Sequence, residues 1–97
     1  MRIEILESAR DDLRLGHAFY DRQMAGLGNY FLDTLFADID SLLLTAGVHP
    51  IHFDRYHRML SKRFPFAVYY RKEGETVRIY AVLDCRRDPE RAVDRLL

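Results

Sequence analysis

The chain has 97 residues, of which 48% are hydrophobic and 31% are charged, and its formal net charge is zero. This length allows one domain, expected to span residues 1–97, and the apolar content argues against a disordered chain. A single cysteine, Cys85, excludes an internal disulfide framework, and the absence of a signal peptide or of an apolar run near ~20 residues predicts a cytoplasmic protein without membrane contact.

The first half of the chain predicts a strand followed by two helices. Residues 2–6 alternate between apolar and charged side chains, which is typical of a short strand. Apolar residues then recur at helical spacing, which predicts one helix over about residues 9–25 and a second over about 29–47. Gly26 and Gly28 separate them. Two helices joined by so short a break are expected to form an antiparallel hairpin.

The second half predicts three strands, over about residues 57–64, 66–72 and 76–84. Residues 73–75, Glu-Gly-Glu, are typical of a tight connection between the second and third of these strands. Residues 90–97 are expected to add a final helical turn. The predicted class is therefore α+β, with an N-terminal strand, an antiparallel two-helix hairpin and a three-stranded antiparallel meander.

Two helices can cover only one face of such a sheet, so the other face is expected to meet water or a partner. In the last strand, alternation places Ala81 and Leu83 toward the helices and Val82 and Asp84 away from them. Basic and tyrosine side chains are expected to decorate the open face. They are Arg58, Lys62, Tyr69, Arg71, Arg78 and Tyr80.

Charge is divided unevenly along the chain. Residues 1–54 hold four basic and nine acidic side chains, a net charge of −5, whereas residues 55–97 hold eleven basic and six acidic ones, a net charge of +5. Thirteen of the fifteen basic residues are Arg, whose guanidinium binds carboxylate and phosphate in a bidentate manner. This pattern indicates an anionic partner, either nucleic acid or an acidic protein segment. The alternative is that the basic half neutralises the acidic helices of the same chain.

Two segments resemble the RelE/ParE toxin family of type II toxin–antitoxin systems, whose members are also called plasmid stabilisation toxins. Residues 62–71 read KRFPFAVYYR, and residues 81–89 read AVLDCRRDP. The resemblance extends over the whole chain. It implies a compact toxin that inhibits bacterial growth and is neutralised by a cognate antitoxin encoded beside it. Members that resemble ParE poison DNA gyrase, and members that resemble RelE cleave mRNA on the ribosome.

The residues that RelE-like nucleases use are only partly present. Such nucleases place Arg at the position of Ala67 and an aromatic base or acid in the C-terminal segment, whereas this chain has no Tyr or His around Val93. Arg58, Lys62 and Arg87 match basic positions of the family and would be the catalytic residues of a ribonuclease. The resemblance therefore favours a gyrase poison. A ribosome-dependent endonuclease and an inactive interaction partner with a toxin fold remain the alternatives, so whether the chain is an enzyme stays open.

The residues expected to bind the target or the antitoxin are tyrosines and arginines of the open face and of the loop after the last strand. They are Tyr69, Arg71, Arg78, Tyr80, Arg86 and Arg87. No cofactor or metal is expected, because His49, His52 and His57 match no standard zinc spacing. The roles of these histidines and of Cys85 stay open.

Overall fold

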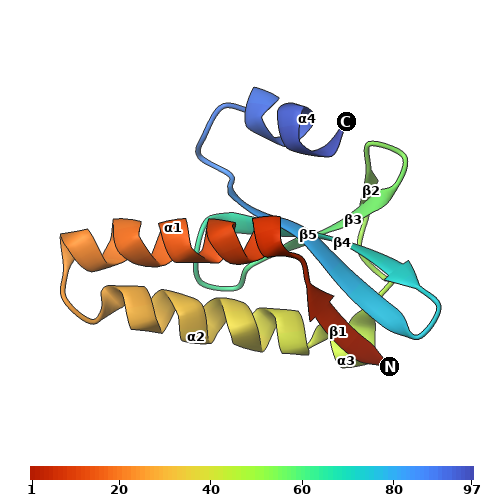
Figure 1. Cartoon of the computed structure of the whole chain (residues 1–97), viewed down its shortest axis with the longest axis horizontal. Helices are drawn as coiled ribbons and strands as arrows, with labels where there is room; N and C mark the ends of the chain where they lie inside the picture. Colours follow the sequence, from red (N-terminus) through yellow and green to blue (C-terminus); the bar gives the residue numbers. More distant parts are fainter.

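The computed structural model describes all 97 residues. Its five-stranded mixed sheet has the order β1-β5-β4-β3-β2. The strands are β1 (Arg2–Ile5), β2 (Ile51–His52), β3 (Tyr56–Leu60), β4 (Phe66–Glu73) and β5 (Thr76–Asp84). The helices are α1 (Glu7–Gln23), α2 (Leu27–Asp40), α3 (Leu42–Thr45) and α4 (Glu90–Leu96). The predicted α+β class, with its helix hairpin and its β3-β4-β5 meander, is confirmed (Figure 1).

The N-terminal strand joins the sheet beside the last strand. β1 runs parallel to β5, with Arg2 opposite Thr76 and Ile5 opposite Ile79. Because β1 ends there, the second half of β5 has no strand on that side. The two-residue β2, which the sequence did not predict, pairs with β3 at the far edge of the sheet.

Helices α1 and α2 pack closely against each other and against one face of the sheet (Figure 1). Two glycines permit this approach: a Cβ added to Gly16 would lie 2.5 Å from the ring of Phe31, and one added to Gly28 would lie 2.6 Å from the carbonyl oxygen of His17. The main core lies beneath the hairpin. None of the helices combines the length and the apolar composition that crossing a bilayer requires.

A β-bulge in β5 changes which side chains face the helices. Tyr69 pairs with Ala81 and Tyr70 pairs with Ile79, which leaves Tyr80 as an extra residue. Such an insertion reverses the alternation beyond it. Val82 therefore packs in the main core with the helices, while Ala81 lies in a second cluster on the opposite face. The prediction that Ala81 and Leu83 face the helices and Val82 and Asp84 face away was wrong for this reason.

The sheet face opposite α1 and α2 is not fully open. Helix α4 lies over its centre (Figure 1), where Leu96 packs in a cluster with Tyr56, Ala67, Tyr69 and Ala81. Tyr69 is only 5% exposed, so the prediction that it decorates an open surface was wrong. The single helical turn predicted for the last residues is a seven-residue helix that forms a third layer.

Candidate partner-binding groove

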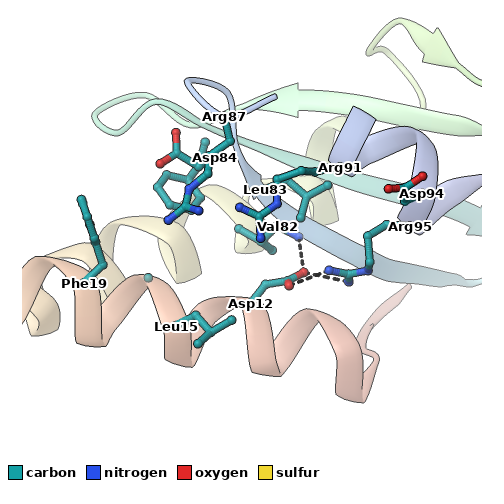
Figure 2. A pocket seen from close by; sticks show the side chains of 12 residues that line it. Asp12, Leu15, Phe19, Val82, Leu83, Asp84, Arg87, Arg91, Asp94 and Arg95 are labelled. Atoms are coloured by element: carbon teal, nitrogen blue, oxygen red, sulfur yellow. Dashed lines mark hydrogen bonds and ion pairs between the residues drawn. The ribbon is translucent and has the colours of Figure 1, made fainter. Parts of the chain in front are cut away.

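A cavity of about 330 Å³ lies along the free edge of β5, between α1 on one side and α4 on the other (Figure 2). Its apolar lining consists of Leu15, Phe19, Phe66, Val82 and Leu83. Its charged lining consists of Asp12, Asp84, Arg87, Arg91, Asp94 and Arg95. Leu15 is 71% exposed, so the structure leaves an apolar side chain uncovered at this site. An apolar floor with a few polar groups around it is typical of a binding site. We call it the α1–α4 groove.

At the free edge of β5, the Asp12 side chain accepts a backbone hydrogen bond that a neighbouring strand would otherwise accept. Its Oδ2 accepts a hydrogen bond of 3.0 Å from the Val82 amide. The same carboxylate accepts bonds of 2.7 and 2.9 Å from Nη1 and Nη2 of Arg95 (Figure 2). The hydrogen bonds with Asp12 raise the pKa of Arg95 above its usual value. Asp12 thus ties α1, β5 and α4 together and fixes the walls of the groove.

Arg87 and Arg91 are the cations that the groove leaves free. Both are exposed, and neither side chain forms an ion pair or a hydrogen bond within the chain. Asp94 lies beside Arg95 and away from Arg87 (Figure 2). The Arg87 end of the groove is therefore positive, and it suits a segment that carries carboxylates next to an apolar side chain.

Arg86, the neighbour of Arg87, is held by the chain itself. Its Nε and Nη2 donate to Oδ1 and Oδ2 of Asp84 at 3.1 and 2.9 Å, and Nη2 also donates to the Tyr20 hydroxyl at 3.2 Å. Its guanidinium lies 5.8 Å from the ring centre of Phe19. Burial alone would raise the pKa of Asp84, but hydrogen bonds from Arg86 hold that pKa below its usual value. The structure thus joins Arg86 to the helix hairpin and leaves Arg87 available.

Arg71, Arg78 and Tyr80 come together near the β4–β5 turn, around two glutamates. Arg78 donates to Glu4 at 3.0 Å and also to Glu73, while the Tyr80 hydroxyl donates to Glu73 at 3.2 Å. Arg71 Nε lies 3.4 Å from a carboxylate oxygen of Glu73. The hydrogen bond from Arg78 is the main cause that lowers the pKa of Glu73. The charges of these two arginines are therefore balanced inside the chain.

The three residues proposed for RNA cleavage lie in different surroundings. Arg58 donates from Nε to the Tyr69 hydroxyl at 3.0 Å on the outer sheet face. Lys62 lies in the β3–β4 loop, where its backbone amide donates to Oδ2 of the buried Asp38 at 3.3 Å. Arg87 borders the α1–α4 groove. Arg58 also donates to the sulfur of Cys85, two residues before Arg87, at 3.4 Å. No hydrogen bond or ion pair joins the three side chains directly.

His49 and His57 surround the buried side chain of Tyr70. The Tyr70 hydroxyl lies 2.6 Å from Nδ1 of His49 and accepts a bond of 2.9 Å from the Gly47 amide. The ring of His57 stacks on Tyr70 at 5.1 Å, and its Nδ1 lies 2.7 Å from the carbonyl oxygen of His49. Burial, and to a lesser extent the nearby His57, lowers the pKa of His49. Nowhere does the structure gather three or more His, Cys, Asp or Glu side chains that could hold a metal ion.

The lowered pKa of His49 predicts a loss of stability in mild acid. The folded chain favours neutral His49, because burial disfavours its charged form, and neutral Nδ1 can accept the proton of the Tyr70 hydroxyl. The unfolded chain binds a proton near pH ~6.5, so the free energy of unfolding should fall as the pH decreases through this value. Thermal unfolding at pH 7.5 and 5.5 measures the effect. His49→Gln keeps an acceptor without a titrating ring and should reduce the difference; an equal loss in this variant would contradict the assignment.

The sequence identified Arg87 but missed its partners in the groove. Arg91 and Arg95 lie four residues apart in α4, and this spacing puts their side chains on one face of the helix, whereas Arg87 lies in the loop before it. That signal was present in the sequence. The role of Asp12 had no local signal, since it depends on a strand 70 residues away.

The sequence matches no protein-family model and no curated protein. Among solved structures, it is similar to a chain of the "Chromosomal ParDE TA system from P. aeruginosa", with a TM-score of 0.73 and 17% sequence identity. The match covers 84% of this chain and 92% of that chain. At this level of identity, the comparison shows that the two chains share a fold.

Proposed function

We propose that this chain is the toxin of a type II toxin–antitoxin system, that it acts in the cytoplasm as a poison of DNA gyrase, and that a cognate antitoxin neutralises it. The observation that carries the proposal is the fold shared with a chain of the ParDE system. The sequence resemblance supports it independently of the fold. One of the two resembling segments, residues 81–89, also supplies Val82, Leu83 and Arg87 to the α1–α4 groove.

The α1–α4 groove is the proposed starting point for the antitoxin. An acidic amphipathic segment would place an apolar side chain against Leu15, Phe19 and Val82, and its carboxylates would face Arg87 and Arg91. Charge complementarity supports this occupant, because both guanidiniums lack a partner within the chain. From there the segment would continue across the sheet toward Arg58.

The placement of the basic residues supports a poison that binds its target rather than a nuclease. General acid–base cleavage of RNA needs a base, an acid and cations converging on one phosphate. Arg58 reaches the loop of Arg87 through the sulfur of Cys85. Lys62 lies apart from both, beside Asp38, so the three cations are not all gathered at one point. A binding poison has no such requirement, because its contacts can be spread over a surface.

Induction of the chain in bacteria tests the proposal. Gyrase-dependent DNA breaks are expected to accumulate, while mRNA in the ribosomal A site stays intact. Lys62→Ala should retain growth inhibition within about tenfold, whereas loss of a catalytic base would lower activity ~10²–10⁴-fold. Cleaved mRNA without DNA breaks would instead identify an endonuclease. Absence of both effects would leave an inactive interaction partner.

A further inference from the structure

The tip of the β2–β3 hairpin has an unusual backbone. Phe53 and Asp54 have φ angles of 57° and 61°, and they are the chain's only non-glycine residues with positive φ. Asp tolerates this left-handed region, but a bulky side chain such as Phe rarely adopts it. Glycine at position 53 would fit this turn with less strain. A strained residue persists only where its surroundings hold it, and such residues are concentrated at functional sites.

This backbone conformation places the Phe53 ring on the outer face of the sheet. The ring of Phe53 lies 6.3 Å from that of Tyr69 and 6.4 Å from that of His52, and it remains partly exposed. Tyr69 is buried beneath it. The hairpin projects from the β2 edge of the sheet (Figure 1), and no residue of β2 or β3 lines the α1–α4 groove.

Two arginines near Phe53 have no acidic partner. Arg55 follows the strained pair and is exposed, and Arg58 bonds only the Tyr69 hydroxyl and the sulfur of the exposed Cys85, at 3.0 and 3.4 Å. Neither forms an ion pair, in contrast to Arg71 and Arg78 on the same face. Aromatic and arginine side chains are enriched at the residues that dominate binding between proteins.

We propose that the hairpin tip, defined as Phe53, Arg55 and Arg58, is the surface with which the chain contacts its target. The partner is an acidic protein surface with a recess for the Phe53 ring; this inference rests on the proposed function and names gyrase as that partner. The two unpaired arginines outnumber the one exposed carboxylate of the tip, that of Asp54, so an acidic partner surface fits its net positive charge. The Phe53 ring requires a recess of matching shape in that surface. A nucleic-acid partner would be an outcome of the test, revealed by inhibition without binding to gyrase.

Two glycine variants separate loss of the ring from a change in the turn, although Asp54→Gly also removes a carboxylate, which an acidic partner should tolerate. Phe53→Gly removes the ring and relaxes the turn, whereas Asp54→Gly relaxes the neighbouring residue and keeps the ring. Binding to purified gyrase and trapping of cleaved DNA are measured over a range of concentrations. Phe53→Gly should weaken both by about 30-fold or more, the factor that corresponds to loss of a dominant contact. Asp54→Gly should change them less than threefold and alter the melting temperature by less than about 4 °C, because Asp already tolerates positive φ.

A charge-matched pair tests the acidic partner. Arg55→Glu should weaken binding about tenfold, while Lys72→Glu, which makes the same change at an exposed residue of β4, should not. Circular dichroism and melting curves verify that each variant is folded. Retained potency in folded Phe53→Gly, or an equal loss in Asp54→Gly, would overturn the hairpin contact and leave the proposed function intact. If the unchanged chain neither binds gyrase nor traps cleaved DNA, the proposed function fails, and the contact fails with it.

Discussion

Replacing both Arg87 and Arg91 by glutamate is expected to weaken binding of the antitoxin encoded beside this chain by about 100-fold or more. The two guanidiniums are exposed and unpaired at the positive end of the α1–α4 groove. Each hydrogen bond to a charged group contributes roughly 1.5–3 kcal/mol, and ~1.4 kcal/mol corresponds to a factor of ten. Charge reversal also adds repulsion of the partner's carboxylates. Calorimetry or surface plasmon resonance with the purified antitoxin measures the change.

A matched variant controls for the change in total charge. Arg22→Glu combined with Lys72→Glu reverses two cations that are also exposed and that do not line the groove. It should alter the affinity by less than about fivefold at physiological salt, where distant charges are screened. An equal loss in both double variants would show that overall charge, rather than the groove, decides the affinity. No loss in either would move the antitoxin to another surface.

Replacing Asp12 by alanine is expected to lower the free energy of unfolding by about 2–3 kcal/mol. The Val82 amide would lose its acceptor, and an unsatisfied buried donor costs ~1–3 kcal/mol. Arg95 would lose a two-pronged partner, but its side chain is 33% exposed, and water limits that contribution. For a domain of this size, the melting temperature should fall by roughly 10–20 °C.

Two further variants divide the effect of Asp12 between its two partners. Asp12→Asn keeps an oxygen that can accept the Val82 amide and should cost less than Asp12→Ala. Arg95→Ala leaves the bond between Asp12 and Val82 in place and should also cost less. If Arg95→Ala were as destabilising as Asp12→Ala, the ion pair rather than the strand edge would hold α4, and the account of Asp12 would be wrong.

The regular elements could be predicted because each shows its period locally. Residues 2–6 alternate, and the apolar stripe of α2 from Phe31 to Ile39 has helical spacing, so neither needs distant information. The bulge at Tyr80 has no such signal, since the apolar run around it looks the same with or without an extra residue. Helix α4 was underestimated because its apolar contribution to the second core is limited to Ala92 and Leu96.

The sequence located basic residues of the candidate site, but it did not show which of them are free to bind a partner. Arg87 was expected at a binding surface and borders the groove, and its role in binding is still to be measured. Arg86 is also an arginine and lies next to Arg87 in the loop, yet its side chain donates hydrogen bonds to Asp84 and Tyr20. Phe53 was not singled out at all, because a positive φ cannot be read from a Phe in a loop. Such differences depend on tertiary contacts that composition and spacing do not encode.

The parallel pairing of β1 with β5 has a consequence for biosynthesis. The Arg2 side chain donates a hydrogen bond to Thr76, which lies 74 positions later in the chain. The helix hairpin has mainly local contacts and can form early, but contacts between such distant segments form late. The α1–α4 groove needs residues 82–87 as well as α4. A nascent chain therefore has no complete groove until both β5 and α4 have been translated, so recognition by the proposed antitoxin has to wait for these two elements.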